Sequence, residues 1–200
     1  MSKLLILNDK KLILASSSRY RRELLSRLRL PFESVSPQVD EVPLPQESPA
    51  DTARRLARQK AEAVAQGHWE ALIIGSDQVA TLGGGALGKP GTHARAVEQL
   101  EAMSGREVEF HTAICLLDAA TGQRQERTVP YTVRFRRLSP ATIERYLTLE
   151  QPYDCAGSAK VEALGISLLE WMRGDDPTAL IGLPLIALTS MLANAGVAVP

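Results

Sequence analysis

The chain contains only two cysteines among its 200 residues, Cys115 and Cys155. They lie far apart, outside any C-x-x-C or C-x-x-H spacing, so the sequence predicts neither a zinc site nor a disulfide framework. A chain with so little cysteine suits a reducing compartment, and we expect a cytoplasmic protein.

Long hydrophobic runs are also missing. The most apolar stretch, residues 180–188, is broken by Gly182 and Pro184 and is far shorter than the roughly 20 residues that span a bilayer. Polar residues at 8–11 interrupt the short apolar patch at 4–7, so we predict no export signal. We expect no partnership with a membrane.

Net charge is absent as well. The 23 basic and 23 acidic residues balance to a formal charge of zero. This balance argues against a protein that grips a polyanion along its whole surface, so we expect no stable nucleic-acid partner. The apolar content of 44% is ordinary for a chain with a proper core.

The pattern of apolar residues predicts an α/β fold in a single domain, residues 1–200, because no repeat or low-complexity linker divides the chain. We predict strands at 11–15 and 32–36, a strand from 71 through 79, and a hairpin of 107–117 with 124–135. Helices are predicted at 18–30, 48–67, 92–103, 139–149 and 184–195, several with Ser-Pro or Thr starts. Residues 1–10 form a possible N-terminal extension.

A serine-rich turn follows the first predicted strand. Ser16, Ser17 and Ser18 precede Arg21 and Arg22 at the start of a helix. Free backbone amides, hydroxyls and guanidinium groups at such a position suit an anion such as phosphate. The alternative is that the serines only cap the helix and the arginines lie on its solvated face.

Two acidic positions follow predicted strands. Asp40-Glu41 comes after the second strand, and Asp77 lies within the third. Carboxylates brought together in this way can hold Mg²⁺ or Mn²⁺ against phosphate oxygens. A loop carboxylate is usually just solvated, but an acid between apolar strand residues costs free energy unless it is paired or binds a metal.

Two lysines could supply positive charge for phosphate chemistry, Lys60 on the second helix and Lys89 in Gly88-Lys89-Pro90. Residues 83–89 have the glycine spacing of a P-loop, but Pro90 replaces the required Ser or Thr and a hairpin is predicted there, so we reject a P-loop. Glu162 lies in a predicted loop, where it could contact a base edge or serve only as a connection.

Several short motifs occur together in one order: Leu14-Ala-Ser-Ser-Ser18 with Arg21-Arg22-x-Leu24-Leu25, Ser36-Pro-x-x-Asp40-Glu41, Lys60-Ala61, Gly75-Ser-Asp-Gln-Val79, Gly88-Lys89-Pro90, Ala156-Gly-Ser158 and Gly182-Leu-Pro-Leu185. In this order they resemble the Maf family of nucleotide pyrophosphatases. The resemblance runs from about residue 11 to the end of the chain.

The resemblance implies an elongated α/β fold with a central mixed sheet, flanking helices and an active-site cleft. It also implies a divalent metal cofactor, Mg or Mn, and hydrolysis of a nucleoside triphosphate to a monophosphate and pyrophosphate. Asp77 matches the general base, with Glu41, Lys60 and Lys89 as further catalytic residues and Glu41 and Asp77 as metal ligands. The substrate-binding residues that we expect are Ser16, Ser18, Tyr20, Arg21, Arg22, Gln78 and Glu162.

Within the family, Gln78 resembles the branch that acts on 7-methyl-GTP, and Tyr20 and Glu162 favour the same branch. A methylated guanine carries positive charge, which an aromatic face and a carboxylate both stabilise. The chain departs from the pattern of that branch at Arg19, Tyr20, Ala159 and Ala163.

Two other functions stay open from the sequence. One is cleavage of dTTP or UTP by the same chemistry. The other is a non-enzymatic protein: a regulator of septum formation, as the resemblance to the family implies, or a nucleic-acid-binding protein, because the segments 19–22 and 134–137 combine basic residues with an aromatic. A small-molecule nucleotide is the expected partner, and a homodimer is left open.

Overall fold

The computed structural model describes residues 10–199 of the chain. Its strands are β1 (Leu12–Ala15), β2 (Glu33–Val35), β3 (Leu72–Leu82), β4 (Gly85–Leu87), β5 (Glu107–Asp118), β6 (Arg124–Phe135) and β7 (Leu169–Arg173). Its α-helices are α1 (Arg19–Ser26), α2 (Pro49–Ala65), α3 (His93–Met103), α4 (Pro140–Glu150), α5 (Pro177–Ile181) and α6 (Leu185–Asn194), and its short 3₁₀ helices are η1 (Ala156–Ser158) and η2 (Leu164–Leu168).

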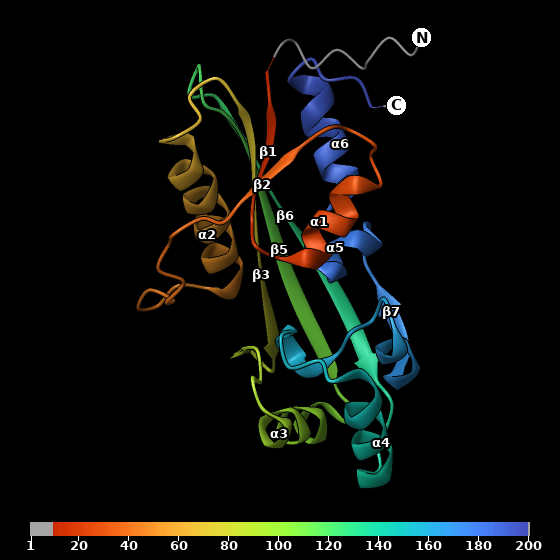
Figure 1. Ribbon diagram of the computed structural model, residues 1–200. Helices are drawn as coiled ribbons and strands as arrows, with labels where there is room; N and C mark the ends of the chain where they lie inside the picture. Colours follow the sequence, from red (N-terminus) through yellow and green to blue (C-terminus); the bar gives the residue numbers. More distant parts are fainter. Residues whose placement is uncertain (1–9, 200) are drawn as a thin grey trace.

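The strands form one mixed sheet in the order β2-β1-β3-β5-β6-β7, with β4 paired to β3. The pairs β1 with β2 and β1 with β3 are parallel, and the remaining pairs are antiparallel. Helices cover both faces of this elongated sheet (Figure 1). The predicted α/β class with a central mixed sheet flanked by helices is therefore confirmed.

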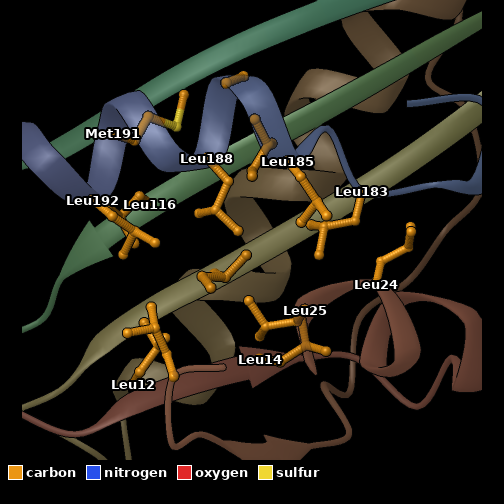
Figure 2. Close-up of a cluster of buried hydrophobic side chains, with 14 of the residues drawn as sticks. Leu12, Leu14, Leu24, Leu25, Leu116, Leu183, Leu185, Leu188, Met191 and Leu192 are labelled. Carbon is orange, nitrogen blue, oxygen red and sulfur yellow. The ribbon is translucent and has the colours of Figure 1, made fainter. Parts of the chain in front are cut away.

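Alternation along the strands divides the core between the two faces, because successive side chains of a strand point to opposite sides. Leu12 and Leu14 of β1 pack with α1 and α6, whereas Ile13 and Ala15 pack with α2. Figure 1 shows α2 on one side of the sheet and α1, α5 and α6 on the other. Figure 2 shows leucines of α1 and α6 in one cluster with Leu12 and Leu14 of β1.

A further apolar core lies toward the other end of β5 and β6, where α3 and α4 pack (Figure 1). Phe135 is its largest fully buried side chain. This cluster supports the segment from β4 to α3 and the segment from α4 to η2. Both segments supply walls of the site described below.

The helix starts that the sequence predicts are confirmed. The side chains of Ser48 and Ser139 accept hydrogen bonds from the backbone N–H groups of Asp51 and Thr142, and each serine is followed by a proline in the first turn. Thr92 caps α3 in the same way. The long hairpin of β5 and β6 is also confirmed.

Three elements differ from the prediction. Helix α1 ends at Ser26 instead of Leu30, because Pro31 disfavours a helical residue before it and Arg29 takes a positive φ of 55°. Strand β7 was not predicted, since an edge strand of five residues has little alternation. Helix α5 was not predicted either, because five residues are too few for helical periodicity to show.

The predicted N-terminal extension, residues 1–10, lies outside the described residues except for Lys10, which pairs with Asp118 at 2.5 Å. The absence of an export signal at 4–11 was predicted from residues that are also largely outside this range. Among residues 10–199, every helix is too short or too polar to cross a membrane.

Helix α2 lies unusually close to β3 at Gly75. A Cβ atom at this position would stand 2.0 Å from the carbonyl oxygen of Ala57 and 2.9 Å from the backbone nitrogen of Ala61. No side chain fits in that space. Glycine at 75 therefore sets how near the helix lies to the strand that carries Asp77.

We expect Gly75→Ala to lower the free energy of unfolding by about 3 kcal/mol, because the methyl group must push the α2 backbone away from β3. Chemical denaturation followed by circular dichroism measures this change. Gly67→Ala, just beyond α2 with open space around the new methyl group, is the matched control and should keep wild-type stability. Equal stabilities of the two variants would contradict the tight contact.

Candidate active site

A gap in strand pairing along one edge of β3 defines the site. β5 pairs with the opposite edge without interruption from Leu72 to Thr81. On the near edge the pairing with β1 ends at Gly75, and the pairing with β4 begins at Ala80. Residues 76–79 therefore have no strand beside them on that edge.

A cavity of about 920 Å³ lies at this gap, a size typical of a small-molecule site. Its walls come from residues 16–21 after β1, the loop and helix from Pro37 to Lys60, and residues 84–89 around β4. Segment 154–162 and the end of α5 complete it. The predicted cleft is thus present in the structure.

Asp77 and Gln78 both line the cavity although they are neighbours on one strand and point to opposite faces of the sheet. Asp77 meets Lys60 on the α2 side, and Gln78 meets the backbone of α5 on the other side. An open strand edge lets a single cavity reach both faces.

Lys60 joins the two carboxylates that the sequence singled out. Its Nζ lies 2.6 Å from Oδ1 of Asp77 and 2.6 Å from Oε1 of Glu41. The side chains of Lys60 and Asp77 are only 6% and 10% exposed, whereas that of Glu41 is 59% exposed. A cation therefore stands between the carboxylates, and the three residues form one charged group in the cavity wall.

Glu41 is held in its charged form. Partial burial acts to raise its pKa, but the hydrogen bond and charge of Lys60 outweigh this effect, with help from Lys89 and Arg21. The pKa of Glu41 lies below its ordinary value as a result. At neutral pH the carboxylate is therefore available as an oxygen ligand.

The loop that carries Glu41 is fastened to α2 by a second ion pair, which the sequence did not reveal. Glu47 accepts two hydrogen bonds from Arg55, at 2.7 and 2.8 Å, and further ones from Thr52 and from the backbone of Leu44. Arg55 also donates to the carbonyl of Val42, next to Glu41. We call the contact between Glu47 and Arg55 the Glu47–Arg55 clasp; it ties the loop to α2 at Val42 and at Glu47.

The serine turn lies at the cavity as predicted, and its hydroxyls have local partners. Ser16 is buried, and its hydroxyl accepts a hydrogen bond from the backbone N–H of Ser18. The hydroxyl of Ser18 caps α1 by accepting from the N–H of Arg21. Capping and anion binding are compatible here, because the helix N-terminus itself lies in the cavity wall.

Arg21 reaches inward from α1, and its Nε donates to the carbonyl oxygen of Gly182 at 2.8 Å. The hydroxyl of Ser76 donates to the same carbonyl, at 3.0 Å. Burial lowers the pKa of the Arg21 guanidinium, while the charges of Asp77 and Glu41 act in the opposite direction. The result is a positive group held opposite the carboxylates.

The residues predicted to bind the base lie on other walls. Tyr20 donates toward the carboxylate of Asp154 at 3.3 Å, and the guanidinium of Arg19 lies 4.7 Å from its ring centroid. Glu162 lines the cavity from segment 154–162. Gln78 is half-buried, with its amide nitrogen on α5.

Two predicted residues stand further out. Lys89 is exposed and lines the cavity mouth from the segment after β4. Arg22 is exposed on α1 and does not line the cavity. The structure therefore brings together every predicted site residue except Arg22.

Some cavity residues carry no signal in the sequence. Cys155 lies in the wall, where burial raises its pKa to about 11, so it is a thiol and a poor nucleophile at neutral pH. Backbone carbonyls of α5 and of Gly182 just after it accept hydrogen bonds from Gln78, Ser76 and Arg21. A sequence cannot show such contacts, because the acceptors are main-chain atoms.

The donor set suits a hard divalent cation. Oδ2 of Asp77 and Oε2 of Glu41 have no hydrogen-bond or ion-pair partner within residues 10–199, so each carboxylate keeps one oxygen for a ligand. That described range contains no cluster of three or more acidic, histidine or cysteine ligands. Mg²⁺ commonly binds through one or two carboxylates, with substrate phosphates and waters completing its shell.

The chain is similar to proteins of one family. Residues 11–195 match the family described as Maf-like protein. The chain is 63% identical over 185 residues to the 7-methyl-GTP pyrophosphatase of Cupriavidus metallidurans, covering 92% of this chain and 93% of that protein. It is 64% identical over 183 residues to the protein of the same name from Ralstonia nicotianae, covering 92% and 94%. The Staphylococcus aureus Ham1 protein aligns with a TM-score of 0.47 at 14% identity, covering 64% of this chain and 73% of that one.

The clasp between Glu47 and Arg55 predicts a pH-dependent contribution to stability. Hydrogen bonding to Arg55 lowers the pKa of Glu47 to about 2, from about 4.3 in an unfolded chain. A carboxyl with a lowered pKa stabilises the fold fully above the unfolded value, and the contribution is lost as pH falls through the folded value. Glu47→Gln should therefore be less stable than wild type at pH 6, and the difference should shrink between about pH 4.3 and 2.

Urea unfolding at a series of pH values measures this difference. An Arg55→Met background serves as the control, because the partner that lowers the pKa of Glu47 is then gone and the pH dependence should largely vanish. A difference between Glu47→Gln and wild type that stays constant from pH 6 to pH 2 would contradict the prediction.

Proposed function

The chain belongs to the family of Maf-like proteins, and from that premise we propose that it hydrolyses 7-methyl-GTP to 7-methyl-GMP and pyrophosphate. Relatives above 60% identity across almost their whole length carry the name 7-methyl-GTP pyrophosphatase. The observation that carries the proposal is Asp77, a buried carboxylate paired with Lys60 beside Glu41 in a cavity with Arg21 opposite.

Asp77 acts as the general base in this proposal. Its Oδ1 is tied to Lys60, and its Oδ2 is left to accept a proton from water. The water oxygen attacks the α-phosphorus, and the bond from that phosphorus to the bridging oxygen of the β-phosphate breaks. Pyrophosphate leaves, and the proton from water passes to the carboxylate of Asp77. General-base catalysis of this kind contributes about 10²–10⁴-fold to a rate.

Positive groups on several sides offset the charge of the triphosphate. Lys60 and Arg21 line the inner walls, Lys89 lies at the mouth, and the N-terminus of α1 presents backbone N–H groups with Ser16 and Ser18. Fixed positive groups stabilise the charge that develops on phosphate oxygens in the transition state without reorganising. Binding at several points also holds the α-phosphorus in reach of the water.

A divalent cation fits beside this group, where Oε2 of Glu41 is free to bind it, while Oδ2 of Asp77, also expected from the sequence to bind the metal, is kept in this proposal for the proton of water. When bound, it would supply Lewis-acid stabilisation of phosphate oxygen charge. Mg²⁺ and Mn²⁺ both prefer such oxygen donors. The protein residues keep their own roles: Lys60 fixes both carboxylates, and the Glu47–Arg55 clasp keeps the Glu41 loop in place.

The methylated base belongs on the opposite wall from the carboxylates. 7-Methylguanine is cationic, and the aromatic ring of Tyr20 with the carboxylate of Glu162 offers a suitable environment. The guanidinium of Arg19 lies 4.7 Å from the centroid of the same ring, a contact of the kind proposed here for the methylated base. Gln78 supplies a hydrogen-bonding amide within the same cavity.

Asp77→Asn should lower turnover by about 10²–10⁴-fold, because the amide cannot take the proton from water. The assay uses purified protein with Mn²⁺ and identifies the products from 7-methyl-GTP, GTP, dTTP and UTP by chromatography. Asp175→Asn, at an exposed position outside the cavity, is the matched control and should keep full activity. Near-normal turnover by a folded Asp77→Asn variant would remove the proposed base.

Chelation should abolish cleavage reversibly. Excess EDTA removes the cation, and added Mg²⁺ or Mn²⁺ should restore turnover, because without the cation the carboxylates of Glu41 and Asp77 repel the triphosphate beside them. In Glu41→Gln, more Mn²⁺ should be needed for half-maximal activity, since one carboxylate ligand is gone. Undiminished activity in EDTA would exclude the metal from the proposal.

A further inference from the structure

The amide of Gln78 has an unusually constrained setting. Its Nε2 lies 2.8 Å from Oγ1 of Thr112, 2.8 Å from the carbonyl oxygen of Ala179 and 3.1 Å from that of Leu180. Thr112 is fully buried on β5, and its hydroxyl lies 2.8 Å from the same Ala179 oxygen. Three oxygens therefore surround one end of the amide.

These oxygens decide which end of the amide faces them. A backbone carbonyl can only accept a hydrogen bond, so an amide oxygen turned toward Ala179 and Leu180 would meet two acceptors and no donor. The Thr112 hydroxyl donates to Ala179 and is then able to accept from Gln78. The nitrogen must face α5, and both of its protons are used there.

The oxygen of the same amide is left for the cavity. Oε1 of Gln78 has no hydrogen-bond partner within residues 10–199, and Gln78 lines the cavity wall. Free glutamine offers both a donor and an acceptor, but this one presents an acceptor alone. Because its nitrogen is already bonded within the protein, Gln78 can only accept a hydrogen bond from a ligand in the cavity.

We propose that Thr112 is a positioning residue for substrate selection: with the α5 carbonyls it locks Gln78 so that Oε1 accepts an N–H from the base. The identity of the base rests on the proposed function. Guanine offers a ring N–H and an amino group on its pairing edge, and uracil offers a ring N–H. Adenine and cytosine differ at the ring nitrogen, which carries no proton and would face Oε1 with no hydrogen bond; their only N–H donors on that edge are the neighbouring amino groups, so the selection acts at the ring position.

The test compares Thr112→Val with Thr112→Ser. Valine keeps the shape and removes the hydroxyl, so the amide loses one tether and can turn. The preference for 7-methyl-GTP over ATP, measured as a ratio of kcat/KM, should fall about 10-fold. The loss should appear in KM for 7-methyl-GTP more than in kcat. Serine retains the hydroxyl and should restore the preference.

Thr81→Val provides the matched control. Thr81 is also a buried threonine in the same strand pair, and its hydroxyl bonds only the backbone carbonyl of Glu109. This variant should keep the wild-type substrate ratio. Equal losses in Thr112→Val, Thr112→Ser and Thr81→Val, or equal loss on both triphosphates, would show a scaffolding role and overturn the proposal.

Gln78→Met keeps the test decisive if Thr112→Val fails to fold. Methionine has nearly the same length and lacks Oε1, so the substrate ratio should fall at least as far as in Thr112→Val. A folded Gln78→Met variant with the wild-type ratio would overturn the proposal whatever Thr112 does.

A measurement on the free protein tests the locking of the Gln78 amide by Thr112 independently of which nucleotide the enzyme cleaves. In the NMR spectrum of the free wild-type protein, both side-chain N–H protons of Gln78 should be protected from solvent exchange, and Thr112→Val should lose part of that protection. Rapid exchange in wild type would overturn the locked amide. If the enzyme cleaves pyrimidine triphosphates instead, the substrate proposal fails, and UTP against CTP becomes the pair whose ratio Thr112→Val must reduce.

Discussion

The contact between helix α2 and strand β3 at Gly75 is the constraint on which the site depends. With no side chain at 75, the helix backbone approaches the strand closely enough for Lys60 to reach Asp77 two residues further along. Lys60 then reaches Glu41 from the loop that precedes the helix. A larger residue at 75 would move the helix, the lysine and the loop together. The distances between the charged groups therefore depend on how closely α2 packs on β3.

The buried pair of Lys60 and Asp77 contributes little net stability to the fold. Removing a lysine and an aspartate from water costs free energy that their attraction only partly returns, and an apolar pair of similar size would often be as stable. The cavity keeps the pair because each member has a further role. Lys60 orders two carboxylates, and each carboxylate retains an oxygen without a partner among the described residues. Arg21, fixed on the carbonyl of Gly182, balances this negative charge from the other side.

Local signals in the sequence predicted much of the fold. Ser48, Thr92 and Ser139 mark helix starts with their caps, and alternating or apolar runs mark the long strands. The short elements β7 and α5 escaped prediction because five residues carry too little periodicity. Most residues of the cavity wall that the sequence predicted came from short motifs, because residue types and their order along the chain can be recognised before the fold is known.

What the sequence could not show are contacts that depend on strand pairing. The open edge of β3 arises because its pairing with β1 ends at Gly75 and its pairing with β4 begins at Ala80, and no local pattern records that gap. The bond between Gln78 and Thr112 joins neighbouring strands 34 positions apart in sequence. Acceptors such as the carbonyls of Ala179 and Gly182 belong to the main chain, so no residue type identifies them.

The position of the cavity at a strand edge has an evolutionary consequence. In the proposed function, Lys60 and Asp77 meet on the α2 side of the sheet and Gln78 is held on the α5 side, with only the thickness of β3 between them. On that proposal, mutations at Thr112 and around the carbonyls that hold Gln78 can change which nucleotide is cleaved while Lys60 and Asp77 keep their contact. A scaffold of this kind allows duplicated genes to diverge in specificity without first losing their chemistry.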